Sequence, residues 1–135
     1  MICSEETNKA MDSLCNALNR LQDVEVYCYR QKGSVDFNFC DNRPIYNQSF
    51  LVDVGVTKFC GIARLKSALS HVQNKNDIKC KMEITEADWD RLVISITSPD
   101  MYNLDPKSFE SNIYKLSVGI KSYIKSHING KEAKQ

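Results

Sequence analysis

Three acidic residues stand within a five-residue window in the stretch EITEADWDRLVISI (83–96), beside the only tryptophan of the chain. They are Glu86, Asp88 and Asp90. Clustered carboxylates could bind a hard metal ion or act as an acid and base pair in hydrolysis. A calcium loop that begins at Glu86 needs a glycine at its sixth position and a glutamate at its twelfth, but Arg91 and Thr97 stand there. No histidine lies nearby, and alternating apolar residues flank the cluster on both sides. We therefore predict an acidic hairpin tip, in which Trp89 either packs at the edge of the core or contacts a partner.

The cysteines and histidines do not form a recognisable catalytic or metal-binding pattern. A tight zinc site needs two thiolates separated by two to four residues, and no two of the six cysteines are that close in sequence. The two histidines, His71 and His127, fall near the ends of expected helices, and no local sequence marks a cysteine as an activated nucleophile. The five glycines are scattered, so no phosphate-binding loop is present. We predict no catalytic residues, no metal and no cofactor, and therefore a protein that is not an enzyme.

Aromatic and basic residues follow one another in the stretch VEVYCYR (24–30). We expect Tyr27, Tyr29 and Arg30 on the face of a strand opposite Val24 and Val26. Exposed rings beside basic residues are typical of surfaces that bind single-stranded nucleic acid. The alternative function is therefore that of a small nucleic-acid-associated or phage-type regulatory protein.

Size and charge limit the broad class of the protein. The chain has 135 residues, 18 basic and 17 acidic, and a net charge of +1. This length suits one domain over residues 1–135, ending in a frayed basic tail at about 129–135. The near balance of charges does not favour binding to phosphates as the main activity. The N-terminal stretch MICSEETNKA has no apolar run of the kind found in secretion signals. We expect a cytoplasmic protein with reduced cysteines and no membrane contact.

Hydrophobic periodicity predicts three helices and five strands. The helices are expected over residues 4–21, from 57 to about 74, and over 105–128, where Asp105 and Pro106 give a strong start signal. The strands are expected over residues 23–30, 35–40, 50–56, 77–85 and 91–97. A turn at QKGS (31–34) would join the first two strands, and a loop would follow at DNRPIYNQS (41–49). The resulting order, α-β-β-β-α-β-β-α, predicts a single α+β domain in which helices flank an antiparallel, twisted sheet.

This order of elements resembles that of a known family. The likeness is closest in CKMEIT, LVISITSP and LDPKSFESNIYKLSVGIKSYI, which give a strand, a strand, a short loop and an amphipathic helix. In this respect the chain resembles the class I chaperones of bacterial type III secretion and the YbjN-like proteins that share their fold. The family is usually acidic, whereas this chain is close to neutral.

The resemblance implies a chaperone-like homodimer that holds an extended segment of another protein, such as a secreted effector. Exposed strand edges and apolar patches can bind such a segment by strand addition. The residues expected to contact the partner are Val35, Phe37 and Phe39. The residues expected at the dimer interface are Ile62, Leu65 and Leu69. Binding of another protein is thus the leading hypothesis, and nucleic acid is a possible but less favoured partner.

Overall fold

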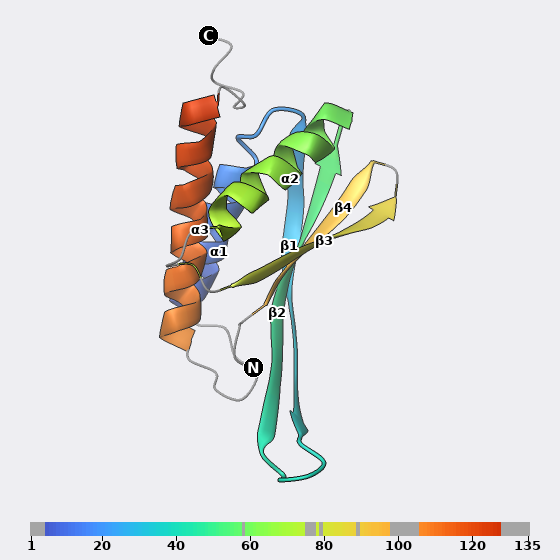
Figure 1. Cartoon of the computed structure of the whole chain (residues 1–135), viewed down its shortest axis with the longest axis vertical. Coiled ribbons are helices and arrows are strands. Elements are labelled where there is room, and N and C mark those ends of the chain that lie inside the picture. The colour runs from blue at the N-terminus through green and yellow to red at the C-terminus, as the bar shows by residue number, and fades with distance from the viewer. Residues whose placement is uncertain are drawn as a thin grey trace.

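A four-stranded sheet with three helices packed on one face makes up the fold (Figure 1). The computed structural model describes residues 5–57, 59–74, 78, 80–88, 90–97 and 106–127. In chain order the elements are α1 (Glu5–Leu18), β1 (Val24–Phe37), β2 (Pro44–Val56), α2 (Phe59–Gln73), β3 (Lys81–Asp88), β4 (Arg91–Thr97) and α3 (Pro106–His127). The predicted basic tail at 129–135 lies outside the described residues.

The sheet is antiparallel throughout, with the strands in the order β1-β2-β4-β3. The α+β class, with an antiparallel sheet and flanking helices, is therefore confirmed. β1 and β3 are the two edge strands, and each pairs on one side only. An edge strand presents backbone groups that can pair with another chain.

The core lies between the inner face of the sheet and the helices. Alternate residues of β2 and β4 point into it, among them Phe50, Val52, Ile94 and Ile96, which are all fully buried. This alternation follows from the two-residue period of a strand with one covered face. The helices bury one stripe each; the stripe residues include Met11, Leu14 and Leu18 of α1, Leu65, Leu69 and Val72 of α2, and Phe109, Ile113, Leu116 and Ile120 of α3.

Small residues allow α3 to pack closely against both other helices. Ser13 of α1 and Ser117 of α3 share a hydrogen bond of 2.8 Å between their hydroxyl oxygens. A Cβ atom at Gly119 would lie 2.6 Å from Cγ1 of Val72, so only glycine permits the observed contact between α3 and α2.

Asp23 joins the end of the α1 segment to the start of α2. Its φ angle of 66° lies in the left-handed region, which aspartate tolerates better than most residues. Its carboxylate forms an ion pair with Arg64 and accepts a 3.2 Å hydrogen bond from the Thr57 hydroxyl. Its backbone oxygen accepts a second bond, of 3.1 Å, from the Thr57 amide. A Cβ atom at Gly61 would lie 2.5 Å from that oxygen, so the connection also depends on a glycine in α2.

The prediction of five strands is wrong, because the strands expected over residues 23–30 and 35–40 form one continuous strand, β1. β1 continues through the expected QKGS turn: Gly33 has no positive φ and pairs with Gln48 of β2. β2 in turn includes most of the expected loop at 41–49. The backbone ladder between the two long strands therefore overrides the local turn signals.

The β1–β2 hairpin extends beyond the rest of the sheet as an arm (Figure 1). β4 pairs with β2 only from Ser49 to Gly55, so residues 33–48 pair only with one another. We call these residues the hairpin arm. Figure 1 shows the arm projecting past the helical layer at the end of the molecule opposite the C-terminal end of α3.

The second hairpin confirms the prediction for the acidic cluster. β3 and β4 pair in antiparallel register, with Asp88 opposite Arg91 and an irregularity between Glu86 and Asp88. Asp90 lies in the turn, where its backbone oxygen accepts a 3.0 Å bond from the Val56 amide. Trp89 lies outside the described residues. Within the described part of the chain, no group of three or more His, Cys, Asp or Glu residues is placed to hold a metal ion. Among the described helices, none is long and apolar enough to cross a membrane.

Candidate functional site

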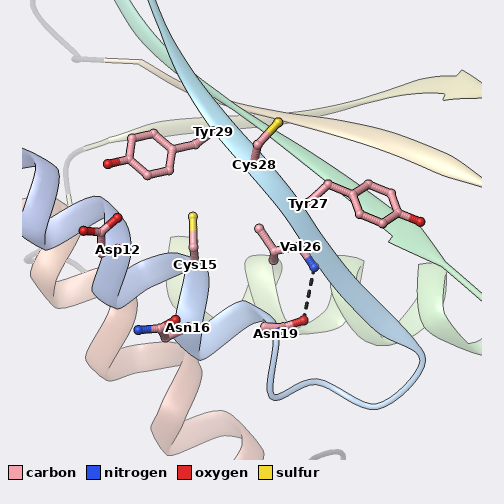
Figure 2. Close-up of a pocket in the computed structure, with 8 residues that line it drawn as sticks. All are labelled: Asp12, Cys15, Asn16, Asn19, Val26, Tyr27, Cys28 and Tyr29. Carbon is pink, nitrogen blue, oxygen red and sulfur yellow. Dashed lines mark hydrogen bonds between the residues drawn. The ribbon is translucent and has the colours of Figure 1, made fainter.

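A groove of about 570 Å³ lies between α1 and the edge strand β1 (Figure 2). We call it the α1–β1 groove. Its lining residues are Asp12, Cys15 and Asn16 of α1, Asn19 in the turn directly after α1, and Val26, Tyr27, Cys28 and Tyr29 of β1. The helix forms one wall and the unpaired side of an edge strand forms the other.

A β-bulge in the groove wall decides where the β1 side chains point. Val26 pairs with Val54, but Cys28, two residues later, pairs with Asp53, so one extra residue is inserted at Tyr27. A bulge shifts the alternation of faces by one position. As a result Tyr29 lies on the helix side of the sheet, whereas strict alternation would have kept it on the same face as Tyr27 (Figure 2).

Tyr29 connects the groove to the core. Its ring packs edge-on against Phe50, with 6.0 Å between the ring centroids. Its hydroxyl donates to the backbone oxygen of Asn8 in α1 at 3.4 Å. Tyr29 therefore fixes the spacing between α1 and β1 and is unavailable for stacking on the outer face.

Tyr27 lies on the outer face, where it covers a glycine. A Cβ atom at Gly55 would lie 2.3 Å from the Tyr27 hydroxyl oxygen, so the ring occupies the space that a side chain would fill. The guanidinium carbon of Arg91 lies 5.4 Å from the centroid of the same ring, within the range of a cation–π interaction. Arg30, also on this face, forms an ion pair with Asp53 at 2.5 Å. The structure therefore does not bring Tyr27, Tyr29 and Arg30 together on one face, which corrects that prediction.

One hydrogen bond shows where the free edge of β1 points. The backbone amide of Val26 donates to the side-chain oxygen of Asn19 at 3.2 Å (Figure 2). A side-chain amide oxygen from the turn that follows α1 thus occupies the position that the carbonyl of a neighbouring strand would take. The backbone edge of β1 therefore faces the groove.

Two thiols line the groove, and both are held in the neutral form. Burial is the main cause that raises the pKa of Cys15 to about 12, with a smaller effect from the Asp12 carboxylate. A 3.3 Å hydrogen bond to Asp53 is the main cause that raises the pKa of Cys28. Because the thiolate is the nucleophilic form, both cysteines are weak nucleophiles at neutral pH.

The predicted dimer residues lie mainly in the core of the chain. Leu65 is fully buried and Leu69 is 4% exposed, so neither has side-chain surface to offer a second copy. Ile62 is half-buried and packs against the same core. The prediction is corrected because the apolar stripe of α2 is used to cover the sheet.

The predicted partner residues lie on the hairpin arm, away from the α1–β1 groove. Phe37 is 63% exposed at the end of β1, and Phe39 is completely exposed in the tip. Val35 lies within β1, but its side chain is outside the described part of the structure.

Sequence patterns alone did not identify the α1 wall of the groove. Asp12, Asn16 and Asn19 lie opposite the apolar stripe of α1, where polar residues normally mean only contact with water. The one available signal was the run of amides on this face, Asn8, Asn16 and Asn19, since asparagine is a poor helix former. No family model, no curated protein and no solved structure matches this chain.

Proposed function

We propose that this protein binds an extended segment of another protein in the α1–β1 groove, by adding that segment as a fifth strand beside β1. The hydrogen bond from the Val26 amide to Asn19 is the observation that carries the proposal. It supports a backbone edge that faces the groove and donates a hydrogen bond to an amide oxygen. Strand addition at an exposed edge is a common way to bind an extended peptide.

The walls of the groove suit a polypeptide better than a small apolar ligand. The partner backbone would pair with β1, while its side chains would alternate between the α1 wall and the outer face. The α1 wall offers the amides of Asn16 and Asn19 and the carboxylate of Asp12. A polar or basic side chain of the partner would find hydrogen-bond acceptors there.

The proposed activity is binding without catalysis. The raised pKa values of Cys15 and Cys28 make both thiols of the groove poor nucleophiles. The role would be chaperone-like, as the resemblance to type III secretion chaperones suggests, and the bound segment would belong to a client such as a secreted effector. The element order behind that resemblance has one strand more than the structure has. A cytoplasmic location is part of the proposal, supported by five free cysteines among the described residues.

A peptide selection with a groove-filling variant tests the proposal. A displayed library of random peptides is selected on the full chain, and the amides affected by each selected peptide are mapped by NMR and hydrogen exchange. We expect slower exchange, when a peptide is bound, at those β1 amides near Val26 that point away from β2. Asn16→Trp places a large ring in the groove from an exposed helix position and should weaken peptide binding by at least about tenfold, the equivalent of 1.4 kcal/mol.

Lys9→Trp is the matched control, because Lys9 is an exposed α1 residue that does not line the groove. The control should bind the selected peptides as tightly as the parent. Peptides that tolerate Asn16→Trp, or that shift amides elsewhere on the surface, would contradict the proposal. Binding that falls steeply with added salt and prefers oligonucleotides to peptides would favour the nucleic-acid alternative instead.

A further inference from the structure

Two exposed apolar features remain outside the α1–β1 groove. One is the tip of the hairpin arm, with Phe37 and Phe39. The other is the outer side of α3, where Tyr114 is 40% exposed and Val118 is 64% exposed. Tyr27 is the remaining large apolar side chain that is exposed among the described residues, and it is held over Gly55.

The arm tip has a defined backbone that holds Phe39 in solvent. The side-chain oxygen of Asn38 accepts hydrogen bonds from the amides of Cys40 at 2.8 Å and Asp41 at 3.3 Å. The backbone closes through Asn38 N to Arg43 O at 2.7 Å, and Asn42 adopts a left-handed φ of 58°. Phe39 therefore points outward because of the turn geometry around it. Two phenylalanines that are exposed two residues apart at one end of the molecule offer more apolar surface than a single exposed residue, and such surface can contact another molecule.

The outer side of α3 carries a hollow that suits such a side chain. A groove of about 370 Å³ runs along residues 111–122, with Ile78 at its side and Tyr114, Val118 and Gly119 along the helix. We call it the α3 groove. Most of its lining surface is apolar.

We propose that a second copy of this chain places Phe37 and Phe39 of its hairpin arm in the α3 groove, and that the exchange is reciprocal. The arm projects away from the helical layer of its own chain, past the end of α3 (Figure 1). The arm of one chain cannot reach the α3 groove of the same chain, but it can reach the α3 groove of a second copy. A twofold axis makes both contacts at once and closes the assembly as a dimer.

The surface involved suits a dimer of modest affinity. Phe39 is fully exposed and Phe37 is 63% exposed, so the two arms together can bury on the order of 500–800 Å² of aromatic surface. With the exposed parts of Tyr114 and Val118 from the two α3 grooves, the total is on the order of 1,000 Å², the lower limit for a specific interface. Neither Leu65 nor Leu69 is needed, so the dimer does not require the α2 core to open.

This dimer is independent of the proposed function. It uses the arm and α3, whereas the α1–β1 groove lies at the base of β1, so either surface can be removed without altering the other. Variants at Asn16 should leave the dimer intact, and variants in the arm tip should leave the α1–β1 groove intact. The two proposals can therefore fail separately.

The test measures solution mass by light scattering and sedimentation equilibrium, from micromolar to millimolar concentration. The parent should have twice the 15.4 kDa mass of one chain. Two variants, Phe37→Ser with Phe39→Ser and, separately, Val118→Glu, should each be monomeric. The control Ser126→Glu adds the same charge to an exposed α3 position outside the groove and should stay dimeric. Matching far-ultraviolet circular dichroism spectra and a cooperative thermal transition would show that the variants fold, and loss of the dimer should lower their melting temperature only at high protein concentration.

Mixing the two monomeric variants identifies the contact. The arm variant keeps an intact α3 groove and the groove variant keeps an intact arm, so one arm-to-groove contact remains possible between them. We expect a heterodimer that binds more weakly than the parent dimer. Overturning results are a parent that is monomeric throughout, a single variant that stays dimeric, or a mixture that stays monomeric. The last result would indicate like-to-like contacts, such as α3 against α3.

Discussion

The base of the sheet and the hairpin arm are built from the same two strands but are stabilised differently. At the base, β1 and β2 lie in a four-stranded sheet whose inner face is covered by helices, and Phe50 and Val52 are fully buried. In the arm, the same strands pair only with each other, and Gly33, Phe37 and Phe39 are exposed. Residues at the base therefore determine the stability of the fold, whereas residues in the arm are free to serve an interaction.

The largest expected contrast is between two phenylalanines of the same hairpin. Phe50→Ala should lower the free energy of unfolding by about 3–5 kcal/mol, because it leaves a cavity beside Tyr29 and Phe109. Phe39→Ala should change the free energy of unfolding of one chain by no more than about 0.5 kcal/mol, the usual range for exposed positions. Urea unfolding of both variants at low protein concentration measures the difference. Similar losses in the two variants would mean that the arm packs against the fold.

The same contrast explains how much of the fold could be predicted. At the base, burial imposes a strict pattern: Phe50, Val52, Val54 and Val56 alternate with polar or small residues, and β4 repeats this with Leu92, Ile94 and Ile96. The three helices, β4 and the β3–β4 hairpin were predicted within a few residues of their observed bounds, whereas β2 was predicted correctly at its end and six residues short at its start. The apolar period is a reliable guide wherever one face of an element must be covered.

The errors fall where no core supplies a pattern. In the arm, local turn formers such as Gly33 and Pro44 were the only signal, and cross-strand pairing outweighed them. Apolar and polar residue types alternate in β1 as they would in a regular strand, so the sequence gives no sign of the bulge at Tyr27. The position of Tyr29 on the helix side of the sheet could therefore not be predicted. The α1–β1 groove was missed for a similar reason, because it depends on the distance between two elements and not on either sequence alone.

Two Asp–Arg pairs offer a smaller and closely matched contrast. Asp23 and Arg64 at the base have side chains that are 16% and 25% exposed, whereas Asp41 and Arg43 in the arm tip are 50% and 57% exposed. Asp23→Asn keeps a residue that tolerates positive φ but removes the charge, and should cost about 2 kcal/mol. Asp41→Asn should cost less than about 1 kcal/mol, as is typical of surface pairs. Thermal or urea unfolding at low salt measures the loss of stability in each variant. Equal losses would contradict the conclusion that Asp23 holds the end of the α1 segment to the start of α2.

A buried thiol at the base makes the stability sensitive to alkaline pH. Burial raises the pKa of Cys80 from 9.0 to about 12, so the folded chain keeps this proton at pH values where the unfolded chain loses it. Rising pH then favours unfolding, and the stability should fall between pH 9 and 12. Cys80→Ala should reduce this slope by up to about 1.4 kcal/mol per pH unit. Cys40→Ala, at an exposed position in the arm tip, is the control and should leave the slope unchanged.

The smallest effect is expected at the tip of the β3–β4 hairpin, where Glu86 and Asp88 are exposed. Glu86→Gln combined with Asp88→Asn should change the free energy of unfolding by less than about 0.5 kcal/mol, because both changes keep the size of exposed side chains. Calcium or magnesium should raise the melting temperature of neither the parent nor this variant. A metal-dependent rise that occurs in the parent and is lost in the variant would contradict the hairpin-tip interpretation. The acidic tip would then be a metal site, and the contrast between a structural base and an interacting arm would have to include a second functional hairpin.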